Sequence, residues 1–162
     1  ASRLGFERAD ANSVAAVEAF LRTATGESVM LGSVRLATGR AGRFVSRIAR
    51  ARAITLGPAI FFASEPQEPH AALEVQTALE RFGALFVHEC AHVWQYRREG
   101  SAAFLRQYFK SYFSGIWSRR SMARQARLEA YLAIPFEQEA FRLERTWLKS
   151  RTGDSTDHPL GR

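Results

Sequence analysis

Apolar residues recur at helical spacing along most of this 162-residue chain, and they alternate with polar residues over only a few short stretches. The first periodic segment, residues 10–25, predicts a helix that Asn12 or Ser13 caps and that Gly26 ends. Residues 28–37 alternate instead, on both sides of a Gly-Ser pair, and this pattern predicts a strand or a short hairpin.

A second β-prone segment covers residues 53–63, where two apolar runs flank a Gly-Pro pair and predict a hairpin. Helical periodicity then returns and predicts four more helices, at residues 71–98, 101–119, 121–133 and 135–150. We therefore expect an α+β protein, mostly helical, with a small β-sheet or hairpin packed beside the helix 71–98. Its length predicts a single domain over residues 1–150, followed by a flexible C-terminal tail at 151–162.

The segment 101–119 carries a thick stripe of apolar side chains, and two interpretations of it stay open. The stripe consists of Phe104, Leu105, Tyr108, Phe109, Tyr112, Phe113, Ile116 and Trp117. It can be a membrane-interface or partner-binding face, with Arg106 and Lys110 beside it. It can also be a core helix or a wall of a substrate cleft. We favour the core, because a small domain needs these aromatic residues in its interior.

Composition narrows the class of protein. A hydrophobic share of 46% is ordinary for a globular domain, and no apolar run reaches the roughly 18 residues of a membrane span, so no transmembrane segment is expected. Residues 1–6 show no signal-peptide pattern. The single cysteine, Cys90, rules out an internal disulfide and a secreted disulfide scaffold. The bacterial cytoplasm is the default location, and secretion or delivery without a visible signal peptide is the alternative.

The formal charge of +7 comes almost wholly from arginine. Residues 39–52 hold five arginines around Phe44 and Ile48, and they predict a short amphipathic helix. Its basic side is either a site for an anionic partner or a solvated face, and we favour the solvated face. No zinc-finger, RNA-recognition or helix-turn-helix motif accompanies the charge, so no specific nucleic-acid partner is expected.

The candidate chemistry lies in the helix 71–98, where the segment His88–His92 reads H-E-C-A-H and matches the motif H-E-x-x-H. Residues four apart share one face of a helix, so both imidazoles can bind one metal ion. Glu89 is rotated by about 100° from His88, and it can lie beside the metal as the general base for a bound water. Cys90 falls on the apolar side of this helix, so we interpret it as a core thiol.

A zinc site of this type needs a third protein ligand and an open position for water. The solution H-E-x-x-H-x-x-G-x-x-H is absent, because Arg98 occupies the position of its final histidine. We therefore expect a glutamate from a downstream helix. Glu137 and Glu139 are the leading candidates, and Glu129 and Glu144 are weaker ones.

The motif at residues 88–92, followed by E-Q-E-A at residues 137–140, resembles the gluzincin class of zinc metallopeptidases. More narrowly, the sequence H-E-C-A-H-V-W-Q at residues 88–95 resembles small bacterial zincin-like domains that are Vgr-related or found beside contractile injection systems. The resemblance covers about residues 54–143. It implies a zincin-like fold and a Zn²⁺ ion.

By the same resemblance, His88, His92 and Glu137 are the metal ligands and Glu89 is the base. Glu139 is a competing register, because it stands directly before an alanine, as the ligand does in some gluzincins. The acid that orients one imidazole in that class has no counterpart directly after this alanine, where Phe141 stands, so that role stays unassigned.

The main hypothesis is a zinc-dependent metalloendopeptidase that acts on a protein or peptide substrate, with Glu89 passing a proton from water to the leaving amine. We expect an edge strand at residues 59–63 to hold the substrate, and Tyr96, Tyr131 or an arginine to stabilise the oxyanion. The alternative is a non-catalytic zincin-like interaction or accessory module of a bacterial secretion or injection system. Neither hypothesis predicts the oligomeric state.

Overall fold

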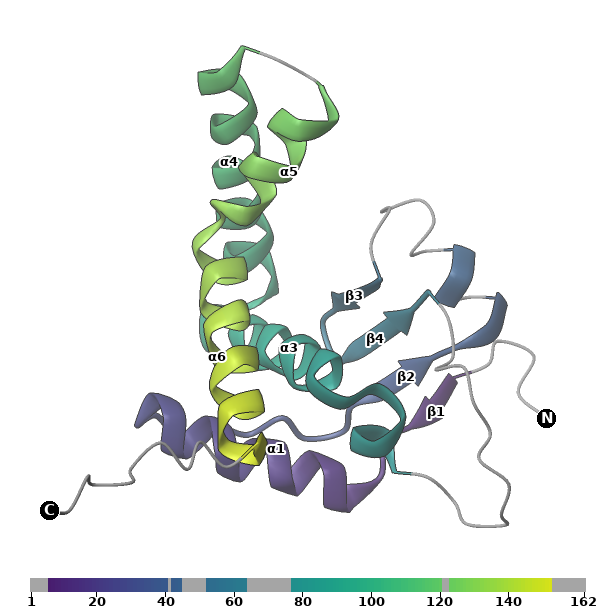
Figure 1. Ribbon diagram of the computed structural model, residues 1–162. Helices are drawn as coiled ribbons and strands as arrows, with labels where there is room; N and C mark the ends of the chain where they lie inside the picture. Colours follow the sequence, from purple (N-terminus) through teal and green to yellow (C-terminus); the bar gives the residue numbers. More distant parts are fainter. Residues whose placement is uncertain (1–5, 41, 45–51, 64–76, 121–122, 153–162) are drawn as a thin grey trace, which may run out of the picture.

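The computed structural model describes residues 6–40, 42–44, 52–63, 77–120 and 123–152. In these residues a small sheet lies beside a larger set of helices (Figure 1), so the predicted α+β class with a mostly helical content is confirmed. No helix in these ranges combines the length and the apolar character that a membrane span requires.

The sheet has the strand order β1-β2-β4-β3, with β2 and β4 parallel and the other two pairs antiparallel. Its strands are β1 (Phe6–Arg8), β2 (Arg35–Ala37), β3 (Ala53–Leu56) and β4 (Ala59–Phe62). The hairpin predicted at residues 53–63 is confirmed, and Gly57 provides the positive φ, 58°, of its turn. The predicted edge strand is wrong, because β4 pairs with β2 on one side and β3 on the other. The end position belongs to β3.

The prediction for residues 28–37 is correct only at its end. β2 covers the last three residues, and no hairpin forms around the Gly-Ser pair. Val29, Leu31 and Val34 are nonetheless buried, so the alternation reflects side chains packed against the core along an irregular segment. β1 pairs with β2 although its three residues carry no periodic pattern that could have predicted it.

Helix α1 (Ala11–Thr25) begins two or three residues earlier than its predicted caps suggest. Asp10 is the N-cap, because its Oδ1 accepts a hydrogen bond from the backbone amide of Ser13 at 2.7 Å. The same carboxylate accepts a second hydrogen bond, from the backbone amide of Ala78 to Oδ2, also at 2.7 Å. Asp10 therefore joins the start of α1 to the start of the helix that carries the motif. Gly26 closes α1 with φ 72°, as predicted.

Helix α3 (Ala78–Glu99) is the motif helix, and its first turn is closed by a capping box between Thr77 and Glu80. The predicted residues 71–76 lie outside the described part. Gly83 interrupts the helix with φ 54° and ψ −134°, a conformation that glycine adopts without the steric cost of a side chain. Beyond the interruption, residues 86–96 are all buried. The motif face is thus covered by protein, whereas the pattern predicted one buried side.

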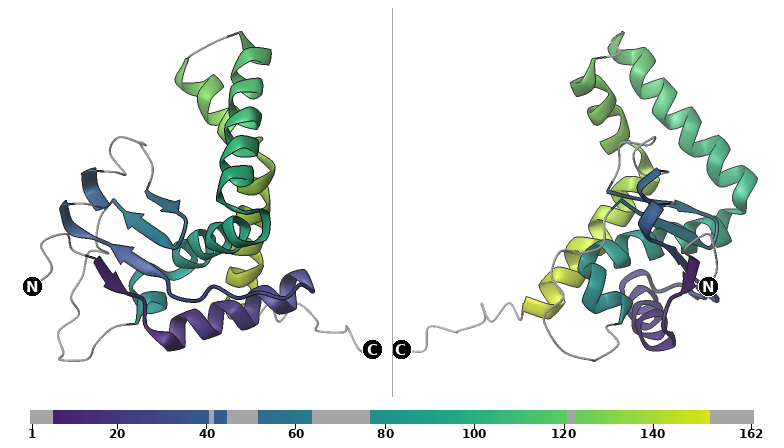
Figure 2. Two further views of the ribbon diagram at one scale, coloured as in Figure 1. Left: turned by 180° about the vertical axis from the view of Figure 1, so that it is seen from behind. Right: turned by 90° about the vertical axis from the view of Figure 1, so that its right-hand side faces the viewer.

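Helices α4 (Ser101–Arg119) and α5 (Arg124–Leu132) form a hairpin that stands out from the sheet, and α6 (Pro135–Thr152) returns across α3 (Figures 1 and 2). Residues 151 and 152 of the predicted tail are helical, and residues 153–162 lie outside the described part. In the basic stretch, residues 39–40 and 42–44 are helical and residues 45–51 are likewise outside.

Two apolar clusters meet along α3. The larger one joins α1, the sheet, α3 and α6, and it contains Cys90, whose complete burial raises the pKa of the thiol, as expected for a core residue. The smaller one joins the end of α3 to α4 and the start of α6 through Tyr96, Phe104 and Phe136. The interpretation of 101–119 as a core helix holds for one side only, since Phe109, Phe113 and Trp117 are exposed.

Candidate metal centre

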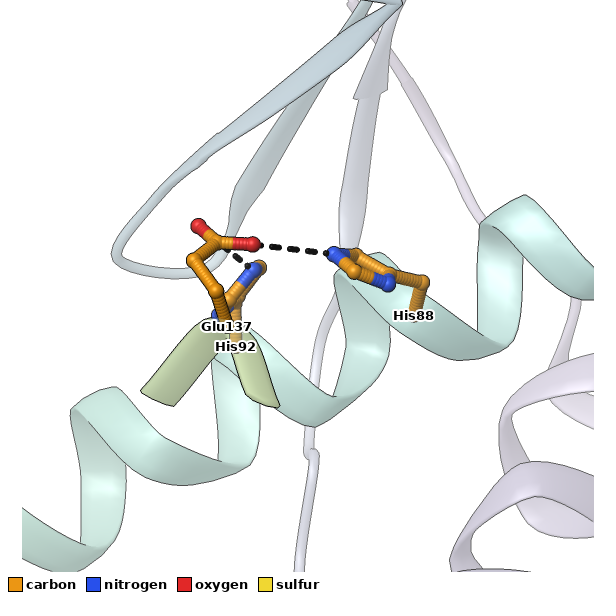
Figure 3. Close-up of side chains that lie close together, drawn as sticks. All are labelled: His88, His92 and Glu137. Carbon is orange, nitrogen blue, oxygen red and sulfur yellow. Dashed lines mark ion pairs between the residues drawn. The ribbon is translucent and has the colours of Figure 1, made fainter. Parts of the chain in front are cut away.

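His88 and His92 lie one turn apart on α3, within the stretch where that helix is wholly buried. Their ring centroids are 5.0 Å apart, and the rings are nearly perpendicular, at 79°. Both Nε2 atoms face the carboxylate of Glu137, as Figure 3 shows. The helical spacing of the motif therefore directs both imidazoles to one point, which is what the sequence predicted for this pair.

Glu137 reaches the imidazoles from the first turn of α6. Its Oε2 lies 3.4 Å from Nε2 of His88, and its Oε1 lies 3.4 Å from Nε2 of His92. The side chain of Gln95 holds the two helices together at this point, because its amide donates a hydrogen bond to the backbone oxygen of Phe136 at 3.0 Å. The structure thus brings the predicted third ligand to the motif from a distant part of the sequence.

These three side chains have the geometry of a metal site. One donor atom from each lies within 4.8 Å of the other two. Bonds of about 2.0–2.2 Å in a tetrahedral zinc site place neighbouring ligand atoms about 3.3–3.6 Å apart. Both histidine–glutamate contacts measure 3.4 Å, each to a different carboxylate oxygen, so the three side chains could hold a divalent ion. Two imidazoles and one carboxylate leave a fourth position for water, as in catalytic zinc sites.

The outer nitrogen of each imidazole also has a partner. Nδ1 of His88 lies 3.0 Å from a carboxylate oxygen of Glu144, and Nδ1 of His92 lies 2.8 Å from the side-chain oxygen of Gln95. An oxygen acceptor at Nδ1 requires the hydrogen on that atom, which leaves the Nε2 lone pair for a metal. The orienting acid that the sequence left unassigned is Glu144, two turns after Glu137 on the same helix.

Glu139, the competing third ligand, points elsewhere. Its carboxylate accepts two hydrogen bonds from the guanidinium of Arg98, at 3.0 and 3.1 Å, and one from Gln95 at 2.9 Å. These contacts hold it outside the group of three donors. Glu129 accepts hydrogen bonds from Gln125 and Arg119 in the hairpin, so it does not belong to the group either.

Glu89, the predicted base, lies beside the donors and is not one of them. It is only 4% exposed, and its Oε2 accepts a hydrogen bond of 2.7 Å from the hydroxyl of Thr55 on β3. Burial raises the pKa of Glu89, against the opposing effect of the nearby imidazoles and of Thr55. A carboxylate with a raised proton affinity next to a water position suits proton transfer.

Two tyrosines support Glu137, and the sequence had singled out only one of them. The hydroxyl of Tyr108 donates to Oε1 at 2.7 Å, and that of Tyr131 donates to Oε2 at 2.6 Å. Burial, together with the charge of Glu137, raises the pKa of both hydroxyls far above the ordinary value, so both keep their protons. Tyr96, the other predicted oxyanion donor, packs its ring on Phe104 with centroids 4.0 Å apart.

The electrostatics of the group favour a cation among these side chains. Burial alone would lower the pKa of His88, but hydrogen bonds to Glu137 and Glu144 raise it to about 9. Burial would also lower the pKa of His92, but the hydrogen bond to Glu137 and the negative charge of Glu137 raise it. Burial would raise the pKa of Glu137, but its hydrogen bonds with the two histidines hold it well below the ordinary range. Protons and metal ions therefore compete for the same nitrogen atoms.

Comparison with known proteins gives one family. Residues 13–100 match the family model described as the eCIS core domain, where eCIS denotes the extracellular contractile injection system. The matched residues include most of α1, three strands of the sheet and α3 with its motif, and they end before Glu137. No curated protein and no solved structure matches the chain.

Proposed function

Because the chain belongs to the eCIS core domain family, we propose that it works with a contractile injection system and binds zinc through His88, His92 and Glu137. The family supports the association with an injection system, and its description names no reaction. This supports the accessory-module hypothesis more directly than the peptidase hypothesis. A protein that works with an injection system is expected at the site where that system acts. This expectation agrees with the hypothesis that the protein is secreted or delivered from a bacterial cell.

The donor set supports zinc as the metal. Two imidazole nitrogens and one carboxylate oxygen form the set found in many zinc hydrolases, whereas magnesium and calcium prefer sites made of oxygen ligands. The outer partners Glu144 and Gln95 fix the imidazole rings in the orientation that binding requires. A zincin-like fold is part of the proposal, since the motif helix α3 packs against the end strand β3.

Peptide-bond hydrolysis is the activity that the geometry of the centre supports best, and the observation that carries it is the position of Glu89. A zinc ion in the site would polarise the scissile carbonyl and lower the pKa of a bound water. With such an ion bound, Glu89 would accept a proton from water and pass it to the leaving amine, and Thr55 holds the carboxylate of Glu89 in place. Tyr108 and Tyr131 hold Glu137 against the imidazoles. A peptide substrate lies along β3, the end strand of the described sheet.

A non-catalytic accessory module is the second candidate. The family supports it, and so does the burial of the centre, where His88, Glu89, His92 and Glu137 are each at most 6% exposed. A closed metal centre can serve to hold helices together, as structural zinc sites do. In this case Glu89 has no chemical task, and the exposed surfaces carry the function.

The change Glu89→Gln separates the two candidates. Parent and variant are purified without chelator, and their zinc content is measured by inductively coupled plasma mass spectrometry. Their activity is measured as the rate of cleavage of unfolded casein and of a mixed peptide library. We expect about one zinc ion per chain in both proteins and at least a hundredfold slower cleavage in the variant. Glu129→Gln, at an exposed carboxylate of the hairpin, is the control and keeps both properties.

Two results would refute the peptidase proposal. One is equal cleavage by parent and Glu89→Gln, and the other is a zinc-loaded parent that cleaves neither substrate. A parent that takes up no zinc, even when zinc is supplied, would refute the metal centre itself.

A further inference from the structure

The outer face of α4, which we define as Phe109, Phe113 and Trp117 with Arg106 and Lys110, is exposed and takes no part in the metal centre or in the proposed cleavage. The three aromatic residues follow at intervals of four and so lie on one side of the helix. They are 50%, 60% and 85% exposed. Single exposed aromatic residues are common on protein surfaces, but a continuous row of three along one helix marks a surface that a partner covers.

The other side of α4 is already occupied by the protein. Phe104 is buried there, and Gly115 approaches Ala130 of α5 so closely that a Cβ on the glycine would lie 3.0 Å from the alanine Cβ. The helix therefore has two apolar sectors, separated on one flank by Gln107, Ser111 and Ser114. The fold covers the sector that holds Phe104, and the outer face stays exposed.

Charge indicates which kind of partner fits. Helix α4 contains no acidic residue, and Arg106 and Lys110 lie among the exposed aromatic side chains. The whole segment 101–132 has six basic residues and one acidic residue, Glu129, which pairs with Arg119 at 3.2 Å. A depression next to this face is lined by Arg106, Gln107, Lys110, Ser111 and Ser114, residue types that can all donate hydrogen bonds to phosphate oxygens.

We propose that the outer face of α4 binds an anionic phospholipid surface, with the helix lying in the plane of the interface. Aromatic rings then enter the boundary between headgroups and acyl chains, and the cations meet the phosphates. A flat lipid surface needs no groove to receive the three rings. A second copy of the chain fits less well, because a two-fold contact through this face would place two copies of the same basic surface against each other.

The position of the hairpin makes the contact possible. Figures 1 and 2 show α4 and α5 standing away from the sheet and from α1. The outer face lies on a part of the chain that follows the matched residues 13–100, so it is not a property of the shared segment. Lipid binding is also independent of the metal centre and of any cleavage.

The test uses the full chain with vesicles of phosphatidylcholine alone or of phosphatidylcholine mixed with phosphatidylglycerol. Binding is measured by co-sedimentation and by tryptophan emission, which reports mainly Trp117 because Trp94 is buried and Trp147 is partly buried. We expect binding to the anionic vesicles, a blue shift of the emission, and weaker binding as salt is added. Phe109→Ser combined with Phe113→Ser and Trp117→Ser should bind at least about tenfold more weakly.

The control variant, Met30→Ser with Leu148→Ser, removes exposed apolar residues far from the hairpin and should bind like the parent. All changed positions are exposed, so circular dichroism should show folded variants. Equal binding by the two variants, or no preference for anionic vesicles, would overturn the proposal. A dimer of the parent that the triple change dissolves would overturn it in favour of a second copy. Binding to an acidic protein but not to vesicles would overturn it in favour of a protein partner.

Discussion

Two imidazoles and two tyrosine hydroxyls contact the single carboxylate of Glu137. The imidazoles are held in turn by Glu144 and Gln95, on the sides that face away from that carboxylate. The orientation of every donor atom thus depends on a residue that does not itself belong to the group of three. Metal affinity should respond to these supporting residues almost as strongly as to the donors.

Glu144→Ala tests this dependence. The change removes the acceptor from Nδ1 of His88, so the ring loses its fixed orientation and part of its basicity. We expect zinc affinity to fall by about 10-fold to 100-fold, as for other supporting residues of zinc sites. Affinity is measured by competition with a chromogenic zinc chelator. Glu129→Ala, a carboxylate paired with Arg119 on the hairpin, is the control and should bind like the parent. Equal affinity in the two variants would contradict the role of Glu144.

For single residues, the sequence predicts those positions in the site that depend only on spacing within one helix. His88, Glu89 and His92 follow from one turn of helix, and the structure has them as that turn requires. The partners of the site depend on tertiary packing, which brings β3, α4 and α6 together. Thr55 and Tyr108 therefore carried no local sign of their contacts, and Glu144 appeared only as a weak ligand candidate. Periodicity alone does not show which helix will pack against which.

The side chain of Asp10 caps the start of α1 and also binds the start of α3. The carboxylate of Asp10 accepts backbone hydrogen bonds from Ser13 at the start of α1 and from Ala78 at the start of α3. Burial is the largest single influence and opposes ionisation, but the hydrogen bonds from Ala78 and Ser13 together outweigh it and lower the pKa of Asp10 below its ordinary value of 3.8. A pKa that is lower in the folded state than in the unfolded state stabilises the fold above the unfolded value. That contribution is lost as the pH falls through the folded value.

Asp10→Asn therefore has a pH-dependent cost. Asparagine can cap α1, but its one side-chain oxygen does not replace two charged acceptors for both helices. We expect the free energy of unfolding to be about 1 kcal/mol lower at pH 7, and the difference from the parent to shrink below about pH 4. Urea unfolding of the metal-free proteins at a series of pH values measures this difference. A difference that stays constant down to pH 2.5 would show that the charge of Asp10 does not contribute.

Long helices were predicted more reliably from the sequence than short strands. All of the long helices have the expected places, because many repeated apolar positions support each one. The three-residue strands β1 and β2 have too few residues for a pattern, and the alternation before β2 was mistaken for pairing. The exposed row on α4 was assigned to the core, because helical spacing shows that residues share a side but not whether that side is covered.

At the scale of the whole molecule, the candidate metal centre connects two helices that are far apart in the sequence. α3 supplies two donors and α6 the third, and the two helices pack against each other. A metal bound by the folded protein and not by the unfolded chain adds its binding free energy to that of folding. The stability of the domain should therefore rise with the zinc concentration.

Thermal unfolding with and without zinc measures this link. At a free zinc concentration 100 times the dissociation constant, the gain is about 2.7 kcal/mol, which corresponds to an increase in Tm of about 5–10 °C for a domain of this size. Glu137→Gln should abolish most of the increase, and Glu129→Gln should keep it. An equal increase in both variants would mean that zinc binds elsewhere, and magnesium in place of zinc should have little effect.

The end of the family match has an evolutionary consequence. The segment 13–100 contains His88, His92 and Glu89, the proposed base, whereas Glu137 and Glu144 come from α6. A descendant that inherited this segment but acquired a different C-terminal half would keep H-E-x-x-H and have no complete centre. If His88, His92 and Glu137 hold a metal, the matched segment alone does not contain the complete centre.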